Sequence, residues 1–155
     1  MYSNVKLLVL DFDGVMTNNK VIVDENGKES IICNRSDGMG VEMIKNKGID
    51  VIVISKEVNK VVKARCDKLN VPCVHGVDDK LSILKKELNN RSLHPEDVCY
   101  IGNDVNDIEC LKYVGIGIVV NDAFPEVKKV AKVVTKKNGG EGAVREIIDN
   151  ILKKN

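Results

Sequence analysis

Short runs of branched apolar residues recur along the chain, and segments with a helical spacing of apolar positions separate them. The apolar runs are 5–10, 50–54, 98–101, 116–120 and 131–134. Runs with so few polar residues are typical of strands buried on both faces of a sheet. Strands that alternate with helices predict an α/β fold with a doubly wound (Rossmann-like) parallel sheet.

The segments between these runs place apolar residues every three or four positions, with charged residues in between, as amphipathic helices do. Such segments are 58–69, 81–88 and a last helix that begins near Ala143 and continues to about Leu152. We also expect Asp37 to cap a helix that ends before Gly48, and Pro125 to occupy the first turn of another helix.

One segment breaks the alternation directly after the first strand. Residues 20–24 and 28–34 flank Glu25-Asn26-Gly27, and the Asn-Gly pair is a strong signal of a tight hairpin turn. We expect this hairpin, about residues 18–34, to form a flap over the strand ends. We expect residues 1–155 to form a single domain, with a C-terminal tail and helix at about 138–155.

The composition is that of an ordinary globular protein. The chain has 24 basic and 23 acidic residues, a net charge of +1 and only 3% aromatic residues, so neither charge nor base stacking favours a nucleic-acid partner. Its five cysteines include no Cys-x-x-Cys pair, which fits a reducing compartment, and no apolar run is long enough to cross a bilayer. We therefore expect a cytoplasmic protein with no membrane partner.

Polar residues directly after the predicted strands are the first candidates for a site, since ligands of open α/β sheets bind beyond the carboxyl ends of the strands. The first strand leads into Asp11-Phe12-Asp13-Gly14. Alternation along an extended chain points both carboxylates the same way, and carboxylates so close repel unless a cation lies between them. The pair suits Mg²⁺, with one carboxylate left to attack and the other to transfer protons.

Three further segments follow predicted strands or bends. Ser55 follows the second strand, a glycine bend leads to Asp79-Lys80, and a later strand ends in Gly102-Asn103-Asp104-Val105-Asn106-Asp107. A hydroxyl and an ammonium group bind phosphate oxygens, and the last cluster offers more oxygen ligands for a metal. Taken singly, Ser55 is better explained as a helix cap and Lys80 as a surface lysine. Their positions at the strand ends make them candidates.

The same residues resemble a known family. The motifs Asp11-x-Asp13-Gly-x-x-Thr, Ser55, Lys80 and Gly-x-x-x-Asn-Asp, in that order, are similar to the four-motif signature of the haloacid dehalogenase superfamily. The short hairpin in place of a large cap domain, the segment 34–40 and the tail 139–146 resemble one capless branch. That branch contains the phosphatases of 3-deoxy-D-manno-octulosonate 8-phosphate and deaminoneuraminate 9-phosphate, and the C-terminal domain of animal acylneuraminate cytidylyltransferases.

The resemblance implies a Mg²⁺-dependent phosphatase, with a phosphorylated sugar acid as substrate and an aspartyl-phosphate intermediate. Asp11 would be the nucleophile and Asp13 the general acid and base, while Ser55 and Lys80 would bind the transferring phosphoryl group. The implied metal ligands are Asp11, Asp13, Asn103 and Asp104, with Asp107 holding Lys80. It also implies a homotetramer, in which flaps and tails of neighbouring subunits help to close each active site.

The resemblance further assigns a set of residues to the substrate's leaving group. These are Asn34, Arg35, Ser36, Asp37, Gly38, Glu57 and Arg65. Arg65 could reach a substrate carboxylate. Glu57 stands where the deaminoneuraminate phosphatase also has an acid and the octulosonate phosphatase a base, which favours a nine-carbon acylneuraminate or deaminoneuraminate 9-phosphate over the octulosonate phosphate.

Two features leave alternatives open. Asn103 stands where the family usually has an aspartate metal ligand, and the cytidylyltransferase domains also carry asparagine there. The alternative function is therefore a catalytically weak assembly or regulatory module associated with an acylneuraminate cytidylyltransferase. The glycine-rich segment 139–142 is either a flexible linker or part of a tail that closes a site.

Overall fold

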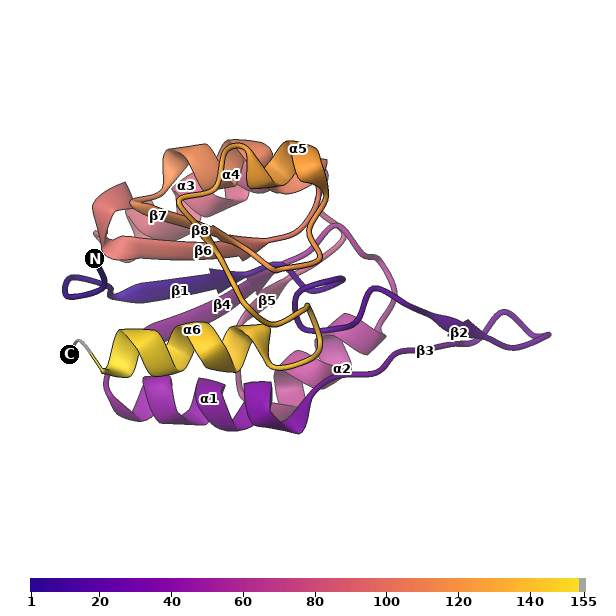
Figure 1. The fold of residues 1–155 in the computed structure, drawn as a ribbon. Helices are drawn as coiled ribbons and strands as arrows, with labels where there is room; N and C mark the ends of the chain where they lie inside the picture. The colour runs from indigo at the N-terminus through magenta and orange to yellow at the C-terminus, as the bar shows by residue number, and fades with distance from the viewer. Residues whose placement is uncertain (154–155) are drawn as a thin grey trace.

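The computed structural model describes residues 1–153, and its centre is a six-stranded sheet in the order β5-β4-β1-β6-β7-β8 (Figure 1). The strands are β1 (Leu7–Leu10), β4 (Asp50–Ile54), β5 (Cys73–Val74), β6 (Val98–Gly102), β7 (Ile116–Val119) and β8 (Val133–Val134). All neighbouring pairs are parallel, so the predicted doubly wound sheet is confirmed. Strand β5 has only two residues, so no apolar run marks it, although the sequence places a third strand before the glycine bend that leads to Asp79-Lys80.

Helices cover both faces of the sheet. They are α1 (Arg35–Asn46), α2 (Val61–Lys68), α3 (Lys80–Asn90), α4 (Ile108–Tyr113), α5 (Pro125–Lys128) and α6 (Ala143–Leu152), with short 3₁₀ helices at Pro95–Asp97 and Val105–Asp107. Helices α1, α2 and α6 lie on one face, and α3, α4 and α5 on the other (Figure 1). Within residues 1–153, no helix has both the length and the apolar character needed to span a bilayer.

The core explains why the central strands read as continuous apolar runs. Every residue of β1 is fully buried, because β1 lies mid-sheet with helices on both faces. On α6, Ile147, Ile148 and Ile151 form a fully buried stripe, and α6 packs against α1. Each such buried side chain contributes about 1.5–3 kcal/mol of hydrophobic free energy.

The start of α1 corrects the predicted cap. Asn34, not Asp37, caps this helix, since its side chain accepts the Ser36 N–H at 2.8 Å. Asp37 lies in the first turn of α1 and is 1% exposed; its Oδ1 accepts the N–H of Arg145 at 2.9 Å. Asp37 therefore serves as a cap for α6, which no local pattern in the sequence could show.

The predicted flap is present but extends differently from the expectation. Strands β2 (Ile22–Val23) and β3 (Glu29–Ser30) pair antiparallel, and Asp24 Oδ1 accepts the N–H groups of Asn26 and Lys28 within the turn. In Figure 1 the hairpin projects beyond the edge of the domain, and so does not fold over the strand ends of its own chain. Its apolar side chains are exposed as a result: Val21, Ile22, Val23 and Ile32 are 50–61% exposed.

The glycine-rich segment before α6 is a packed element, which we call the strap (residues 138–142). Gly140 N–H donates to Val15 O at 2.9 Å, and Gly139 N–H donates to Asp122 Oδ1 at 2.8 Å. A Cβ atom on Gly139 would lie 1.7 Å from the carbonyl oxygen of Gly14, so this contact requires glycine. The strap is not a flexible linker. Residues 154–155 of the predicted tail lie outside the described residues.

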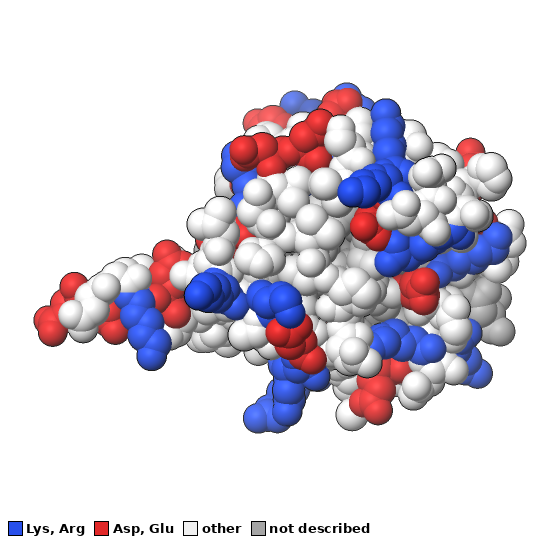
Figure 2. All heavy atoms as spheres, turned by 180° about the vertical axis from the view of Figure 1, so that it is seen from behind, with Lys and Arg blue, Asp and Glu red and all other residues white. Residues whose placement is uncertain are grey.

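Charged side chains of both signs lie on the face of the molecule opposite to the view of Figure 1. Figure 2 shows one face, on which basic and acidic side chains lie interspersed and the flap projects to one side. This distribution agrees with the near-neutral net charge of +1.

Candidate active site

A pocket of about 390 Å³ lies beyond the carboxyl ends of β1, β4 and β6. After β1 the chain adds β4 and β5 on one side, and then crosses to β6 on the other. Such a switch point is where open α/β sheets bind ligands. The pocket is lined by Asp11, Asp13, Asn19, Ser55, Lys56, Glu57, Val58, Asn103, Asp104 and Asn106.

The loop after β1 is held by hydrogen bonds within the loop. Phe12 O accepts the N–H groups of Val15 and Met16, and Thr17 Oγ1 accepts those of Gly14 and Asn19 at 3.1 Å. Gly14 has φ +78°, and a Cβ atom there would lie 1.9 Å from Asn103 Nδ2. Glycine thus permits both the turn and the close approach of the Asn103 side chain.

A buried charge network lies beneath the pocket. Lys80 Nζ donates to Asp11 Oδ1 at 2.7 Å and to Asp107 Oδ1 at 2.8 Å, and the exposed fractions are 2% for Lys80 and 0% for Asp107. Lys80 is therefore not a surface lysine. Burial disfavours its ammonium, but Asp11 and Asp107 outweigh this and raise the pKa of Lys80. Burial, reinforced by Asp107 and opposed by Lys80, raises the pKa of Asp11 to about 7.

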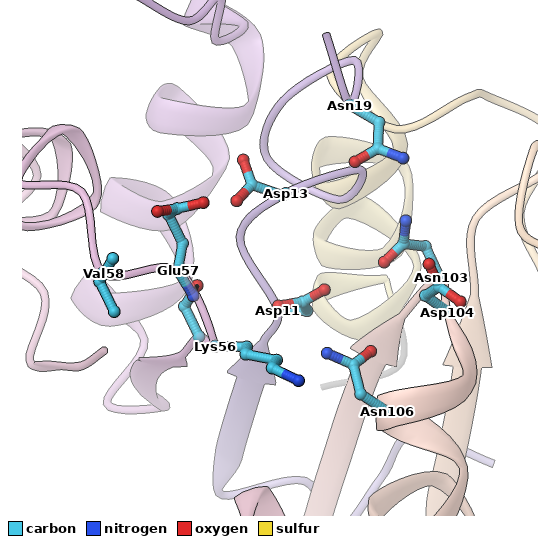
Figure 3. A pocket seen from close by; sticks show the side chains of 10 residues that line it. Asp11, Asp13, Asn19, Lys56, Glu57, Val58, Asn103, Asp104 and Asn106 are labelled. Atoms are coloured by element: carbon cyan, nitrogen blue, oxygen red, sulfur yellow. Dashed lines mark hydrogen bonds between the residues drawn. The ribbon is translucent and has the colours of Figure 1, made fainter. Parts of the chain in front are cut away.

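Two carboxylates face each other across the mouth of the pocket. Figure 3 shows Asp13 and Glu57 turned toward one another. Partial burial, followed by repulsion from Glu57, raises the pKa of Asp13, which favours its protonated form. Ser55 Oγ accepts the Glu57 N–H at 3.1 Å, which leaves its hydroxyl proton free to be donated to a ligand.

The oxygens at the centre of the pocket fit a hard cation. Asn103 Oδ1 is buried without a hydrogen-bond partner, and Figure 3 shows the Asn103 side chain beside Asp11. Buried polar atoms without a partner are rare, and an unpaired oxygen next to a carboxylate is a donor set that Mg²⁺ accepts. Within residues 1–153, no three His, Cys, Asp or Glu side chains cluster as metal ligands. A cation here would therefore depend on amide and backbone oxygens as well as carboxylates.

Most of the predicted leaving-group residues lie elsewhere in the single chain. Asn34, Arg35, Ser36, Asp37, Gly38 and Arg65 do not line this pocket; only Glu57 of that set does. Arg65 borders a separate hollow beside the flap, and its Nη2 donates to Asn34 O at 3.4 Å. Their contact with substrate stays a prediction.

Four lining residues were not predicted. Lys56 and Val58 lie within three residues of Ser55, and Asn106 falls inside the predicted metal cluster, so their position was a usable signal. No sequence signal marked Asn19, because it reaches the pocket by virtue of a left-handed backbone conformation with φ 64°.

Comparison with known proteins agrees with this geometry. A family model of haloacid dehalogenase-like hydrolases matches residues 71–148. The 3-deoxy-D-manno-octulosonate 8-phosphate phosphatase of Escherichia coli (strain K12) is 35% identical over 150 residues, which cover 96% of this chain and 80% of the relative. The chain belongs to the haloacid dehalogenase-like hydrolases.

Solved structures of such hydrolases share the whole fold. The octulosonate 8-phosphate phosphatase of Moraxella catarrhalis, in complex with magnesium, phosphate and KDO, matches with a TM-score of 0.95 and 30% identity, covering 98% of this chain and 88% of that one. The cobalt-bound phosphatase of Haemophilus influenzae matches with a TM-score of 0.94 and 29% identity, covering 98% and 90%.

Proposed function

We propose that this haloacid dehalogenase-like hydrolase is a Mg²⁺-dependent phosphatase of a phosphorylated 2-keto-3-deoxy sugar acid. The observation that carries the proposal is the juxtaposition of Asp11, held by buried Lys80, with the unpartnered Asn103 oxygen in one pocket. The relatives named for octulosonate 8-phosphate hydrolysis support the substrate class.

In the proposed reaction, an Asp11 carboxylate oxygen attacks phosphorus in line with the sugar oxygen. The bond from phosphorus to the sugar breaks, and Asp13 gives its proton to the departing oxygen. Asp13 then takes a proton from water, which attacks the aspartyl phosphate and releases phosphate from Asp11. Ser55 and Lys80 donate hydrogen bonds to the phosphoryl oxygens.

The pocket's electrostatics suit these roles. Burial and the Glu57 charge raise the pKa of Asp13, a shift in the direction that a proton donor to the leaving group requires. Mg²⁺ bound by Asp11, the backbone carbonyl of Asp13, Asn103 and Asp104 would supply positive charge beside the phosphoryl group and favour the ionised form of Asp11.

We infer a nine-carbon acylneuraminate or deaminoneuraminate 9-phosphate as the preferred substrate, ahead of octulosonate 8-phosphate. The support is Glu57, an acid that lines the pocket and faces Asp13. An acid at this point disfavours a substrate carboxylate nearby and accepts hydrogen bonds from sugar hydroxyls.

We also propose a homotetramer in the cytoplasm. The exposed apolar residues of the flap support association between copies, since an apolar projection of this kind is stabilised when another subunit covers it. The second candidate function, a weakly active assembly module, rests on Asn103, an uncharged ligand that binds Mg²⁺ less strongly than a carboxylate would.

Phosphate release from a panel of sugar acid phosphates tests the proposal. Deaminoneuraminate, acylneuraminate and octulosonate phosphates are assayed with Mg²⁺ and with EDTA, beside Asp11→Asn. We expect turnover that requires Mg²⁺, disappears in the variant and is fastest with a nine-carbon substrate. Release no faster than that of the variant would reject the phosphatase and favour the assembly module, whereas preference for octulosonate phosphate would reject only the nine-carbon assignment.

A further inference from the structure

We propose that Tyr100 is a positioning residue for phosphoryl transfer, which acts by fixing Asp107 and, through it, Lys80. The inference rests on the proposed phosphatase activity. Tyr100 lies on β6, and its hydroxyl donates to Asp107 Oδ1 at 2.7 Å. Asp107 and Lys80 stand between this hydroxyl and Asp11, so Tyr100 would act on the reacting atoms only through them.

The Tyr100 side chain is fully buried, and its strand, β6, lies between β1 and β7 in the sheet. Burying a hydroxyl group costs free energy unless it finds a partner, and phenylalanine would fill the same space without that cost. The hydroxyl is therefore explained by its partner, Asp107, rather than by packing.

Asp107 is held from two sides. Its Oδ2 accepts the backbone N–H of Asn103 at 2.9 Å and that of Asp104 at 3.3 Å, while its Oδ1 accepts both Tyr100 and Lys80. A Cβ atom on Gly102 would lie 2.6 Å from the Asp107 carboxylate, so the carboxylate packs directly on the strand end. Tyr100 is the side-chain donor that fixes Oδ1 opposite the ammonium group.

Lys80 is the link to the chemistry. An ammonium group has three N–H donors; one goes to Asp11 at 2.7 Å and one to Asp107 at 2.8 Å, which leaves the third for a phosphoryl oxygen. Without the Tyr100 hydroxyl, Asp107 Oδ1 carries more unshared negative charge and draws the ammonium toward itself. The Lys80 contacts to Asp11 and to the phosphoryl group then weaken.

The test is Tyr100→Phe in the full-length chain, with Tyr113→Phe on α4 as the matched control. A hydrogen bond to a charged group contributes enough to predict a fall in kcat of about 10- to 100-fold, with KM changed much less. We expect the inhibition constant of orthovanadate, which resembles the phosphoryl group in the transition state of its transfer, to rise by a similar factor. Tyr113→Phe should match the wild type in both measurements.

The orthovanadate measurement separates positioning from a structural role. Partial misfolding lowers the amount of active protein, and hence the apparent kcat, but leaves the inhibition constant at the wild-type value. A wild-type inhibition constant in Tyr100→Phe would therefore overturn the proposal. So would a further fall of the same size when Tyr100→Phe is added to Lys80→Ala, since residues that act through one another are not additive.

Failure of the proposed function gives a different pattern. If the wild type releases no phosphate, orthovanadate binding with Mg²⁺ is measured by calorimetry in the wild type and in Tyr100→Phe. Weaker binding in the variant would support the positioning role without turnover. Equal binding, or no binding by the wild type, would overturn it.

Discussion

The buried carboxylate of Asp37 gives the chain an unusual dependence of stability on pH. Asp37 caps α6 through the Arg145 N–H, and its Oδ2 is buried without a partner. Burial raises its pKa to about 6, against the opposing effect of the Arg145 hydrogen bond, compared with about 3.9 in an unfolded chain. Two units of difference correspond to roughly 3 kcal/mol.

The sign follows from proton binding. Between about pH 4 and pH 6 the folded chain holds a proton on Asp37 that the unfolded chain has released, so this group's contribution to stability falls as pH rises through that window. Asp37→Asn mimics the protonated carboxyl and keeps an acceptor for Arg145. We expect the variant's advantage in free energy of unfolding to grow by up to about 3 kcal/mol from pH 4 to pH 8.

Urea unfolding of the wild type and Asp37→Asn across this range measures the difference. Asp149→Asn is the control, because Asp149 lies on the same helix as Arg145 and is paired with it at the surface. In Asp37→Asn the amide nitrogen takes the place of Oδ2, which already lacks a hydrogen-bond partner. The free energies of unfolding of the two proteins are therefore expected to contain a constant difference at every pH besides the pH-dependent one, and only the change of the difference with pH tests the role of Asp37. A difference in free energy of unfolding that does not vary with pH, or that shifts in favour of the wild type as pH rises, would show that Asp37 does not have a raised pKa in the folded chain.

Three other changes test the site and its supports. Gly139→Ala should lower the free energy of unfolding by at least about 1–3 kcal/mol, because its Cβ would clash with Gly14 O; an unchanged urea midpoint would contradict the strap contact. Lys80→Met leaves the buried carboxylates of Asp11 and Asp107 without a neutralising charge, and should lower the free energy of unfolding in urea by about 3–5 kcal/mol at pH 8. The loss should be smaller at pH 5, where Asp11 is protonated; equal losses at pH 5 and pH 8 would contradict this prediction. Glu57→Gln removes a charge that raises the pKa of Asp13, so the basic limb of the kcat profile should move to lower pH; a stationary limb would argue against Asp13 as the acid.

The fold was largely predictable because its signals are local. Residues such as Leu7–Leu10 are buried on both faces and read as an unbroken apolar run, and α6 carries its buried stripe in plain helical spacing. The order of the strands has no such signal, and neither does β5, which pairs with β4 over two residues only.

The candidate site divides in the same way. Asp11, Asp13, Ser55 and Asn103 follow strands, so the topology of a parallel sheet brings them into one pocket. Contacts between segments that are far apart in the sequence could not be predicted from local patterns. Asp37 was mistaken for the cap of its own helix because its partner Arg145 is 108 residues away. The choice between a linker and a closing tail stayed open for residues 139–142, because Gly139 and Gly140 are explained by contacts with the distant segment 14–18.

The most direct test of the central claim is to trap the phosphorylated enzyme. The wild type is mixed with Mg²⁺ and the best substrate of the panel, quenched in acid within a single turnover, digested and analysed by mass spectrometry. We expect one phosphoryl group on the peptide that contains Asp11, and none in Asp11→Asn. Turnover with no phosphorylated peptide, or with the phosphoryl group on another residue, would contradict Asp11 as the nucleophile.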